Sequence, residues 1–265
     1  MGFLASPGIS CYSHPVMQTV LQVKNLSFGF DSNKNLLEDV SFSLKKGEMT
    51  LLAGSNGAGK SILMKILKGL LQCKSGEILV EGKDLSKKPK ERLRSIGLVF
   101  QDADTQIVGQ TVSKDILFGL ENLDIPKREQ EKRLKEMSTL LGLLPLLEHR
   151  PHTLSGGEQR RLAIAGVLVM HPSVLILDEP FANLDYYSIR QVIQSLLELK
   201  GQGVTILLVS HEAEKILAHC EKAMLLEKGR LLASGDSKDM LEVYRNHGIY
   251  IPHSCSLEEL SWLHQ

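Results

Sequence analysis

A glycine-rich run at residues 54–61, the phosphate loop, has residue types and spacing suited to holding phosphate. Its members are Gly54, Ser55, Asn56, Gly57, Ala58, Gly59, Lys60 and Ser61. Glycines let the backbone turn tightly, so that successive N–H groups face a phosphate at the start of a helix. Lys60 would then reach the β- and γ-phosphates, and Ser61 would hold Mg²⁺. The alternative is a glycine-rich turn that binds nothing.

Two acidic residues, Asp178 and Glu179, follow the apolar run at residues 174–177. A carboxylate at the end of a strand can orient Mg²⁺-bound water, and its neighbour can polarise the water that attacks phosphorus. We assign the first role to Asp178 and the second to Glu179. Loss of Glu179 should then spare ATP binding and remove turnover. A solvated acidic turn is the alternative, and a phosphate loop in the same chain argues against it.

A third run, residues 154–159 (LSGGEQ), precedes a predicted helix and is called the signature run below. Ser155, with Glu158 three residues later, forms a capping box. Gly156 and Gly157 leave bare N–H groups at a helix N-terminus, which suits a second phosphate contact. Capping alone explains Ser155 and Glu158 but not the paired glycines.

The elements that must position these residues indicate an α/β fold with a P-loop NTPase core. Alternating apolar and polar residues at 20–44 predict an antiparallel β subdomain. Short apolar runs predict buried strands of a parallel sheet, and apolar residues at helical spacing predict a helix after the phosphate loop. The runs are 50–53, 96–100, 174–177 and 205–209, and the spaced residues are Ile62, Leu63, Ile66, Leu67 and Leu70.

The long stretch between the second and third apolar runs predicts an inserted α-helical subdomain at about residues 102–170, with helices at 128–141 and 156–170. Residues 223–226 and 231–233 predict a hairpin around Lys228-Gly229. We therefore expect an N-terminal extension at 1–16, with Met17 as an alternative first residue, and a main domain at 17–235. The tail at 236–265 is polar, with short helical patches and no recognisable chemistry.

Composition narrows the class of protein. Lys and Arg number 31, as do Asp and Glu, so no net charge attracts nucleic acid or an anionic membrane over a long range. The four cysteines form no C-x-x-C pair, which argues against a zinc site or a disulfide framework and fits a reducing cytosol. No apolar run reaches the roughly 18 to 20 residues that span a bilayer. We expect a soluble enzyme that does not bind nucleic acid.

Taken together, the phosphate loop, the signature run and the acidic strand end resemble the ATP-binding cassette (ABC) family, over about residues 20–235. The resemblance implies that two such domains pair head to tail. Ser155, Gly156 and Gly157 of one subunit would contact the γ-phosphate of an ATP held by the other.

The same resemblance implies roles for four further residues. Gln101 would lie near Mg²⁺ and the attacking water, and His211 would contact the γ-phosphate. Asp185, within the run Asn183-Leu184-Asp185, would belong to a loop that bridges the dimer. An aromatic residue that stacks on adenine is matched best by Phe30, with Phe28 as the rival.

Two positions depart from the family pattern. Ile62 replaces the usual Thr or Ser that contacts the α-phosphate, so we expect a weaker hold on that phosphate. Phe30 replaces the commoner Tyr, which keeps the stacking face and loses a hydroxyl.

Residues 100–109 and 115–122 resemble one branch of the family, the ATPases of energy-coupling factor importers and related cobalt and nickel systems. Asp104 and Gln106 keep the branch pattern Q-N-P-D-x-Q, whereas Asp102 and Ala103 depart from it. The resemblance implies a groove near Gln101 that receives a helix of a separate membrane protein. It also implies a peripheral location at the cytoplasmic face of the cell membrane.

The resulting expectation is an ATPase subunit that powers uptake of a vitamin or a transition-metal ion, with ATP and Mg²⁺ as cofactors. Its partners would be a second ABC ATPase subunit, identical or similar, and integral membrane transport subunits. The alternative is a soluble ATPase of the same fold acting in DNA maintenance or cluster assembly. Such relatives carry long coiled-coil insertions or two cassettes, and this sequence has neither.

Overall fold

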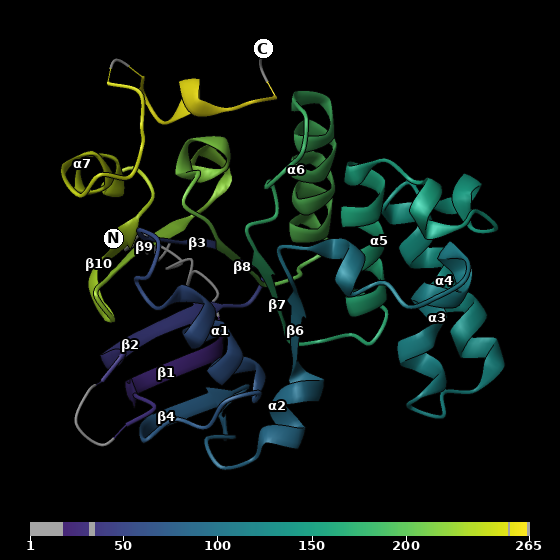
Figure 1. The fold of residues 1–265 in the computed structure, drawn as a ribbon, viewed down its shortest axis with the longest axis horizontal. Coiled ribbons are helices and arrows are strands. Elements are labelled where there is room, and N and C mark those ends of the chain that lie inside the picture. Colours follow the sequence, from purple (N-terminus) through teal and green to yellow (C-terminus); the bar gives the residue numbers. More distant parts are fainter. Residues whose placement is uncertain (1–17, 32–34, 254, 264–265) are drawn as a thin grey trace, which may run out of the picture.

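The computed structural model of the chain describes residues 18–31, 35–253 and 255–263 (Figure 1). The expected N-terminal extension and Met17 lie outside these residues. Among the described residues, no helix is both long and apolar enough to cross a bilayer.

A six-stranded sheet in the order β10-β9-β3-β8-β7-β6 forms the centre of the molecule. Strands β9, β3, β8, β7 and β6 run parallel, and β10 pairs antiparallel to β9. The bounds are β3 (Met49–Ala53), β6 (Ile96–Val99), β7 (Val174–Asp178), β8 (Ile206–Val209), β9 (Lys222–Glu227) and β10 (Arg230–Asp236). The four apolar runs are strands of this sheet, and the predicted hairpin is β9 and β10, so both predictions are confirmed.

The parallel direction brings distant residues to one edge of the sheet. Strands β3, β6, β7 and β8 all end on that edge, so the segments that follow them meet there. Those segments carry the phosphate loop, Gln101, Glu179 and His211. Sequence separation is therefore no obstacle to a shared site.

An antiparallel sheet in the order β2-β1-β4-β5 covers one face of the central sheet together with α1 (Lys60–Lys68). Its strands are β1 (Thr19–Phe28), β2 (Leu37–Lys45), β4 (Ser75–Val80) and β5 (Lys83–Asp84). Alternate side chains of β2 are buried, as the sequence pattern predicts. Strands β4 and β5 were not predicted.

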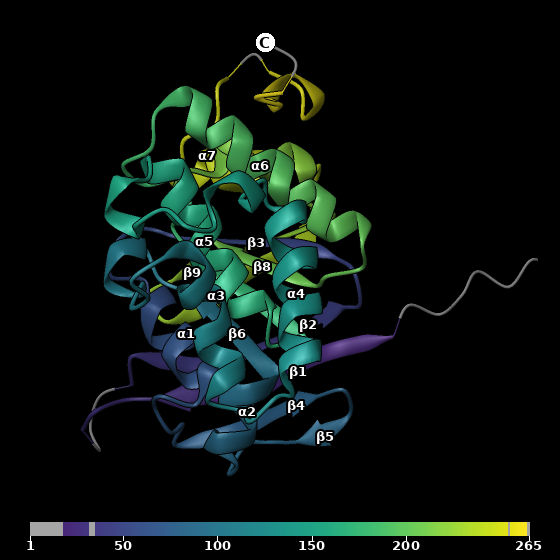
Figure 2. The ribbon, with the colours of Figure 1, turned by 90° about the vertical axis from the view of Figure 1, so that its right-hand side faces the viewer.

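Helices cover the other face of the central sheet and extend to one side of it (Figure 1). They are α3 (Val112–Glu121), α4 (Lys127–Leu140), α5 (Gly156–Leu168) and α6 (Tyr186–Gly201). Helix α2 (Pro89–Ser95) instead packs against α1 and the start of β6. Figure 2 shows α3 and α4 in front of the strands when that side faces the viewer. Helices α4 and α5 match the two predicted helices, whereas α3 was not predicted.

The C-terminal tail packs against the main core. Helix α7 (Met240–Asn246) buries Met240 and Tyr244, and the Tyr244 hydroxyl donates to the Met224 carbonyl at 3.0 Å. Leu260 is buried in the same cluster as the central strands. The chain then crosses from α7 towards the top of α6 (Figure 1). Composition had indicated a polar tail, but its few apolar residues anchor it.

Candidate active site

One pocket of about 270 Å³ gathers most of the predicted site residues. Its lining comprises Asn56, Gly57, Ala58, Gly59, Lys60, Ser61, Ile62, Gln101, Asp178 and Glu179. These residues come from the carboxyl ends of β3, β6 and β7. The fold therefore unites the phosphate loop with the acidic pair and with Gln101.

Close backbone approach explains two glycines of the phosphate loop. A Cβ on Gly54 would lie 2.3 Å from the carbonyl oxygen of Leu226. Gly59 has φ of 104°, and a Cβ there would lie 2.8 Å from the Leu37 side chain. Side chains at these positions would push the loop away from β9 and β2. The loop keeps its turn because both residues are glycine.

Lys60 already points back across the loop. Its Nζ donates to the carbonyl oxygens of Gly54, at 2.6 Å, and Ser55, at 3.2 Å. Burial lowers the pKa of the ammonium, and the nearby carboxylates of Glu179 and Asp178 oppose that shift. A cation is thus held among the backbone groups that would surround a phosphate.

Asp178 is held beside the loop with an unusual affinity for a proton. Burial, followed by the charge of Glu179, raises its pKa to about 6, while Lys60 opposes the rise. Ser61, Gln101 and Asp178 line the same pocket and supply hydroxyl, amide and carboxylate oxygens. Mg²⁺ prefers oxygen ligands of this kind, so these residues fit the ion. A nearby cation would also favour the ionised form of Asp178.

Glu179 is the most constrained acid of the site. Its φ is 44°, a left-handed value for a residue that is not glycine, and only 6% of it is exposed. The carboxylate accepts from the Ser210 hydroxyl at 2.7 Å and from the His211 N–H at 3.1 Å. His211 Nδ1 lies 2.8 Å from the same carboxylate. The ends of β7 and β8 thus bring Glu179, the acid predicted to polarise the attacking water, into contact with His211, the predicted γ-phosphate contact.

The signature run begins α5, apart from the phosphate loop. Ser155 and Glu158 form the predicted capping box, with the Glu158 carboxylate 2.8 Å from the Ser155 N–H. A Cβ on Gly156 would lie 3.0 Å from the Leu184 side chain, and one on Gly157 would lie 2.8 Å from the Ser188 Cβ. The glycines therefore have a packing reason as well. Among the described residues, none of the signature run lines the phosphate-loop pocket.

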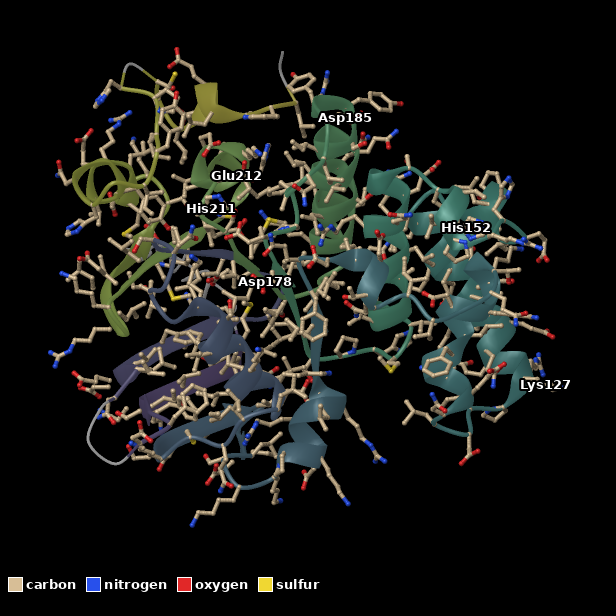
Figure 3. All side chains as sticks on the ribbon, in the orientation of Figure 1. Lys127, His152, Asp178, Asp185, His211 and Glu212 are labelled. Atoms are coloured by element: carbon tan, nitrogen blue, oxygen red, sulfur yellow. The ribbon has the colours of Figure 1, made fainter. Side chains whose placement is uncertain are left out.

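Asp185 caps the N-terminus of α6. Its carboxylate accepts from the Ser188 N–H at 2.7 Å, and that hydrogen bond lowers the pKa of Asp185. Figure 3 places Asp185 at one end of α6, with Asp178 and His211 nearer the centre of the molecule. Leu184 and Ser188, on either side of Asp185, are the residues that face Gly156 and Gly157. The bridging run and the signature run thus share one surface.

Burial distinguishes the two candidate aromatics. Phe28 is 6% exposed and belongs to the core, whereas Phe30 is 71% exposed. Their ring centroids lie 5.1 Å apart, edge to face. The backbone links Phe28 to Leu36, and Leu37 contacts Gly59 of the phosphate loop. Phe30 is therefore the exposed aromatic of the two, and its stacking on adenine stays a prediction.

Arg160 was not singled out from the sequence. It is 3% exposed, and its two terminal nitrogens donate to the carbonyl oxygens of Phe100, at 2.8 Å, and Gln101, at 2.6 Å. Burial lowers its pKa, although neighbouring acids, Asp102 first, oppose this. A signal was available in the sequence, since Arg160 and Arg161 directly precede the apolar part of α5. The distant carbonyls were not visible in the sequence.

The known proteins that resemble this chain in sequence are ATP-binding proteins of ABC transporters. The ABC transporter family model matches residues 37–182. The energy-coupling factor transporter ATP-binding protein EcfA of Methanocaldococcus jannaschii is 36% identical over 91% of this chain and 88% of its own length. EcfA1 of Streptococcus pneumoniae is 36% identical over 84% of this chain and 82% of its own.

Solved structures agree. That of cbiO1 from Clostridium perfringens, part of the ABC transporter complex cbiONQ, superposes with a TM-score of 0.80 at 34% identity, covering 89% of this chain and 96% of its own. An ATP-binding cassette of an ABC transporter in its ADP conformation gives 0.77 at 28% identity, over 89% of this chain and 99% of its own. The chain therefore belongs to the ABC transporter family, as an ATP-binding subunit of its energy-coupling factor branch.

Proposed function

We propose that this chain binds Mg-ATP in the phosphate-loop pocket and hydrolyses it with Glu179 to power an importer at the cytoplasmic face of the membrane. The pocket that unites the phosphate loop, Gln101, Asp178 and Glu179 supports the assignment most directly. Membership of the ABC transporter family indicates that the nucleotide is ATP and that its hydrolysis is coupled to transport. The membrane partners would determine which solute is transported, a vitamin or a metal ion.

Each residue of the pocket has a proposed part in hydrolysis. The loop N–H groups and Lys60 bind the β- and γ-phosphates, and Phe30 stacks on adenine. Ser61, Gln101 and Asp178 hold Mg²⁺, which when bound would neutralise charge that develops on the phosphate oxygens. Glu179 accepts a proton from the attacking water. His211, already against Glu179, orients that carboxylate and reaches the γ-phosphate.

A second subunit, identical or similar, completes the site. The signature run lies outside the pocket of its own chain, and Ser155 and Gly156 are exposed. Its helix N-terminus is suited to an anion. We therefore propose that it contacts the γ-phosphate in the partner's pocket, with Asp185 in the loop that bridges the two subunits.

Replacement of Glu179 by Gln tests the hydrolytic role. The amide keeps the shape of the side chain but cannot take a proton, so turnover should fall by about 10² to 10⁴-fold. ATP affinity should stay within about threefold of wild type, because the loop contacts persist. Glu77→Gln, at an exposed ion pair with Lys24, is the matched control. Near-normal turnover by Glu179→Gln would refute the assignment.

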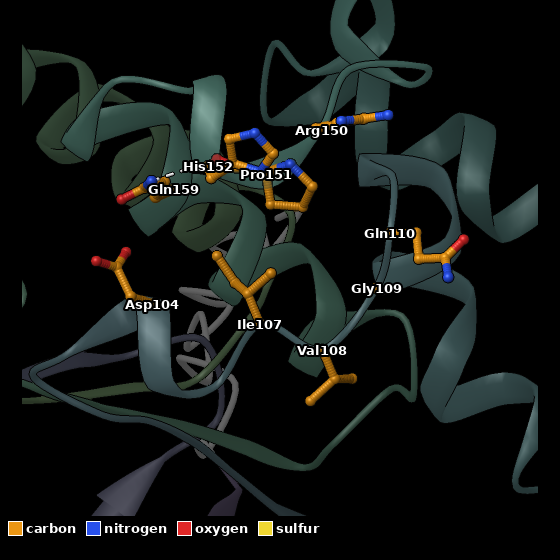
Figure 4. A pocket seen from close by; sticks show the side chains of 9 residues that line it. All are labelled: Asp104, Ile107, Val108, Gly109, Gln110, Arg150, Pro151, His152 and Gln159. Atoms are coloured by element: carbon orange, nitrogen blue, oxygen red, sulfur yellow. Dashed lines mark hydrogen bonds between the residues drawn. The ribbon is translucent and has the colours of Figure 1, made fainter.

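The proposed membrane partner has a hollowed surface to occupy. One hollow, of about 770 Å³, lies between residues 104–110 and the start of α5 (Figure 4). A second, of about 880 Å³, adjoins it at Val108 and runs between α2, α3 and α5. Exposed apolar side chains line it, namely Leu93, Val108, Phe118 and Leu123. An amphipathic helix fits such a groove.

Residues that carry the branch resemblance shape this surface. Gln106 accepts from the Phe100 N–H at 3.0 Å and donates to the Leu98 carbonyl at 3.1 Å. Asp115 accepts from the N–H groups of Val108 and Gly109, each at 2.8 Å. These bonds tie the groove wall to the segment that carries Gln101. A helix seated in the groove could thereby act on the ATP pocket.

Substitution in the groove separates the transport ATPase from a soluble ATPase. Phe118→Glu places a charge on the groove and should detach the tagged chain from the membrane fraction of cells that make the whole transporter. Leu232→Glu, at a residue similarly exposed on β10, should leave it attached. ATP binding by the isolated chain should be unchanged in both. A chain that never sediments with membranes would favour the soluble alternative.

A further inference from the structure

The C-terminal segment, residues 255–263, ends against two loops that serve the ATP sites. The Trp262 ring lies 5.2 Å from that of Tyr186, between centroids, at an interplanar angle of 37°. Lys215 Nζ lies 5.6 Å from the centroid of the Trp262 ring. Aromatic and cation–π contacts of this kind hold their partners in a defined geometry. Trp262 therefore joins the start of α6 to the 3₁₀ turn at Ala213–Lys215.

Several contacts hold the segment in place. Leu260 and Ser261 are buried, and the Ser261 hydroxyl lies 3.2 Å from His219 Nε2. The Leu263 carbonyl accepts from Arg190 of α6 at 3.3 Å. The segment is thus anchored to α6 and to the turn near His219. Trp262 lies between these anchors.

On one side, Trp262 is connected to the signature run through Tyr186 at the start of α6. Tyr186 is the first residue of α6 and directly follows Asp185. Leu184 and Ser188, on the same short stretch, pack against Gly156 and Gly157. A shift of Tyr186 would move the surface against which those glycines rest, because interiors packed this closely transmit displacement.

On the other side, Trp262 is connected to Glu179 through Lys215 and the residues that it contacts. Lys215 forms an ion pair with Glu212, whose N–H donates to the Ser210 hydroxyl at 3.0 Å. That hydroxyl donates in turn to the Glu179 carboxylate at 2.7 Å. Hydrogen bonds and an ion pair thus connect the turn under Trp262 to the proposed base.

We propose that Trp262 is a positioning residue that fixes the signature run relative to the Glu179–His211 pair within one chain. This inference rests on the proposed function. In a head-to-tail dimer the signature run serves the partner's ATP, whereas Glu179 and His211 serve the chain's own. Trp262 consequently couples the two ATP sites, and it does so without touching nucleotide.

The test is steady-state ATP hydrolysis by the full chain. Trp262→Ala should lower kcat by about 10- to 100-fold, as small misplacements of reacting groups do, and leave the Kd for ATP within about threefold. Any cooperativity of the wild type in ATP should fall towards a Hill coefficient of 1. Trp262→Phe keeps an aromatic face and should restore most of kcat. Tyr250→Ala, at a residue 68% exposed in the same tail, should behave as wild type.

The outcomes are separable. If Trp262→Ala keeps the kcat and the Hill coefficient of wild type, the inference is overturned. It is also overturned if kcat falls only in proportion to the fraction of folded protein and falls equally in Trp262→Phe. If Trp262→Ala does not fold, Lys215→Met removes the cation from the ring and should lower kcat with little change in ATP binding; unchanged kcat there also overturns it. A wild-type chain that hydrolyses no ATP would instead contradict the proposed function.

Discussion

At the scale of the residue, Ile62 occupies the position of the phosphate loop that is expected to face the α-phosphate, the phosphate next to the ribose. It lines the pocket and packs partly against the core, and it has no group that could donate to a phosphate oxygen. Lys60 and Ser61, directly before it, keep the groups proposed for the γ-phosphate and Mg²⁺. The loop should therefore hold the α-phosphate less firmly than the other two.

Replacement of Ile62 by Thr should add that missing donor. One hydrogen bond has a net worth of about 0.5–1.5 kcal/mol, so ATP and ADP should bind roughly 2- to 10-fold more tightly. Equilibrium titration with each nucleotide measures the change, and Ile62→Val controls for the altered packing. Equal affinities of the Thr and Val variants would show that the position does not face the α-phosphate.

Asp178 gives a pH dependence whose sign follows from its surroundings. Its pKa rises from 3.8 to about 6, so between these values the folded protein keeps a proton that the unfolded chain has released. The ionised carboxylate therefore lowers the free energy of unfolding above pH 6. That penalty disappears as the pH falls through 6 towards 4.

Asp178→Asn should consequently stabilise the nucleotide-free protein at neutral pH. With a metal chelator present, its Tm at pH 7.5 should exceed that of wild type by about 2–4 °C, the shift that 1 kcal/mol gives in a chain of this size. The two melting temperatures should converge near pH 4. A variant that melts at or below wild type at pH 7.5 would contradict the assigned environment of Asp178.

At the scale of the element, the fit between α5 and α6 depends on the signature glycines. The N-terminus of α5 meets the stretch around Asp185, where a Cβ on Gly157 would overlap Ser188. Any side chain there must displace one helix from the other. The position of the signature run is thus set by the start of α6.

Gly157→Ala should disturb both stability and activity. Overpacking should cost about 1–3 kcal/mol of unfolding free energy, and turnover should fall at least about 10-fold because the signature run is displaced. Gly201→Ala, at the end of α6 where a Cβ meets open space, is the matched control and should be neutral or slightly stabilising. Thermal melts and ATPase assays measure the two effects. Similar behaviour of both variants would argue against the packing explanation.

The sequence predicted elements whose signals are local. The strand, loop and helix around residues 50–70 follow from apolar periodicity and from the glycines of the phosphate loop. Helix α3 carried a comparable signal, since Val112, Ile116 and Leu120 are buried at intervals of four residues. The same stretch carries the branch resemblance at residues 115–122, and its period of four residues predicts a helix equally well.

Other features depend on contacts between distant residues. Arg160 reaches carbonyls about 60 positions away, and Tyr244 is buried against Met224 of β9. Neither partner can be inferred from local spacing. The different burial of Phe28 and Phe30 likewise depends on where β1 ends, since Phe28 is its last residue and is buried, whereas Phe30 lies beyond it and is exposed.

At the scale of the whole molecule, the proposed function divides the ATP site between two places in the chain. The phosphate-loop pocket gathers the groups proposed to bind ATP and activate water, and the signature run lies elsewhere, at the start of α5. On this proposal, enclosing the γ-phosphate takes the pocket of one subunit and the signature run of another. We therefore expect closure of a dimer around ATP to move a membrane-protein helix that is bound in the groove between α2, α3 and α5.

The most direct test is the mass in solution of the Glu179→Gln variant with Mg-ATP. Because this variant should bind but not hydrolyse ATP, we expect an ATP-dependent species of twice the 29.4 kDa mass of one chain. It should be absent with ADP and absent when Ser155→Arg is added. A chain that stays monomeric with Mg-ATP bound would contradict the composite site.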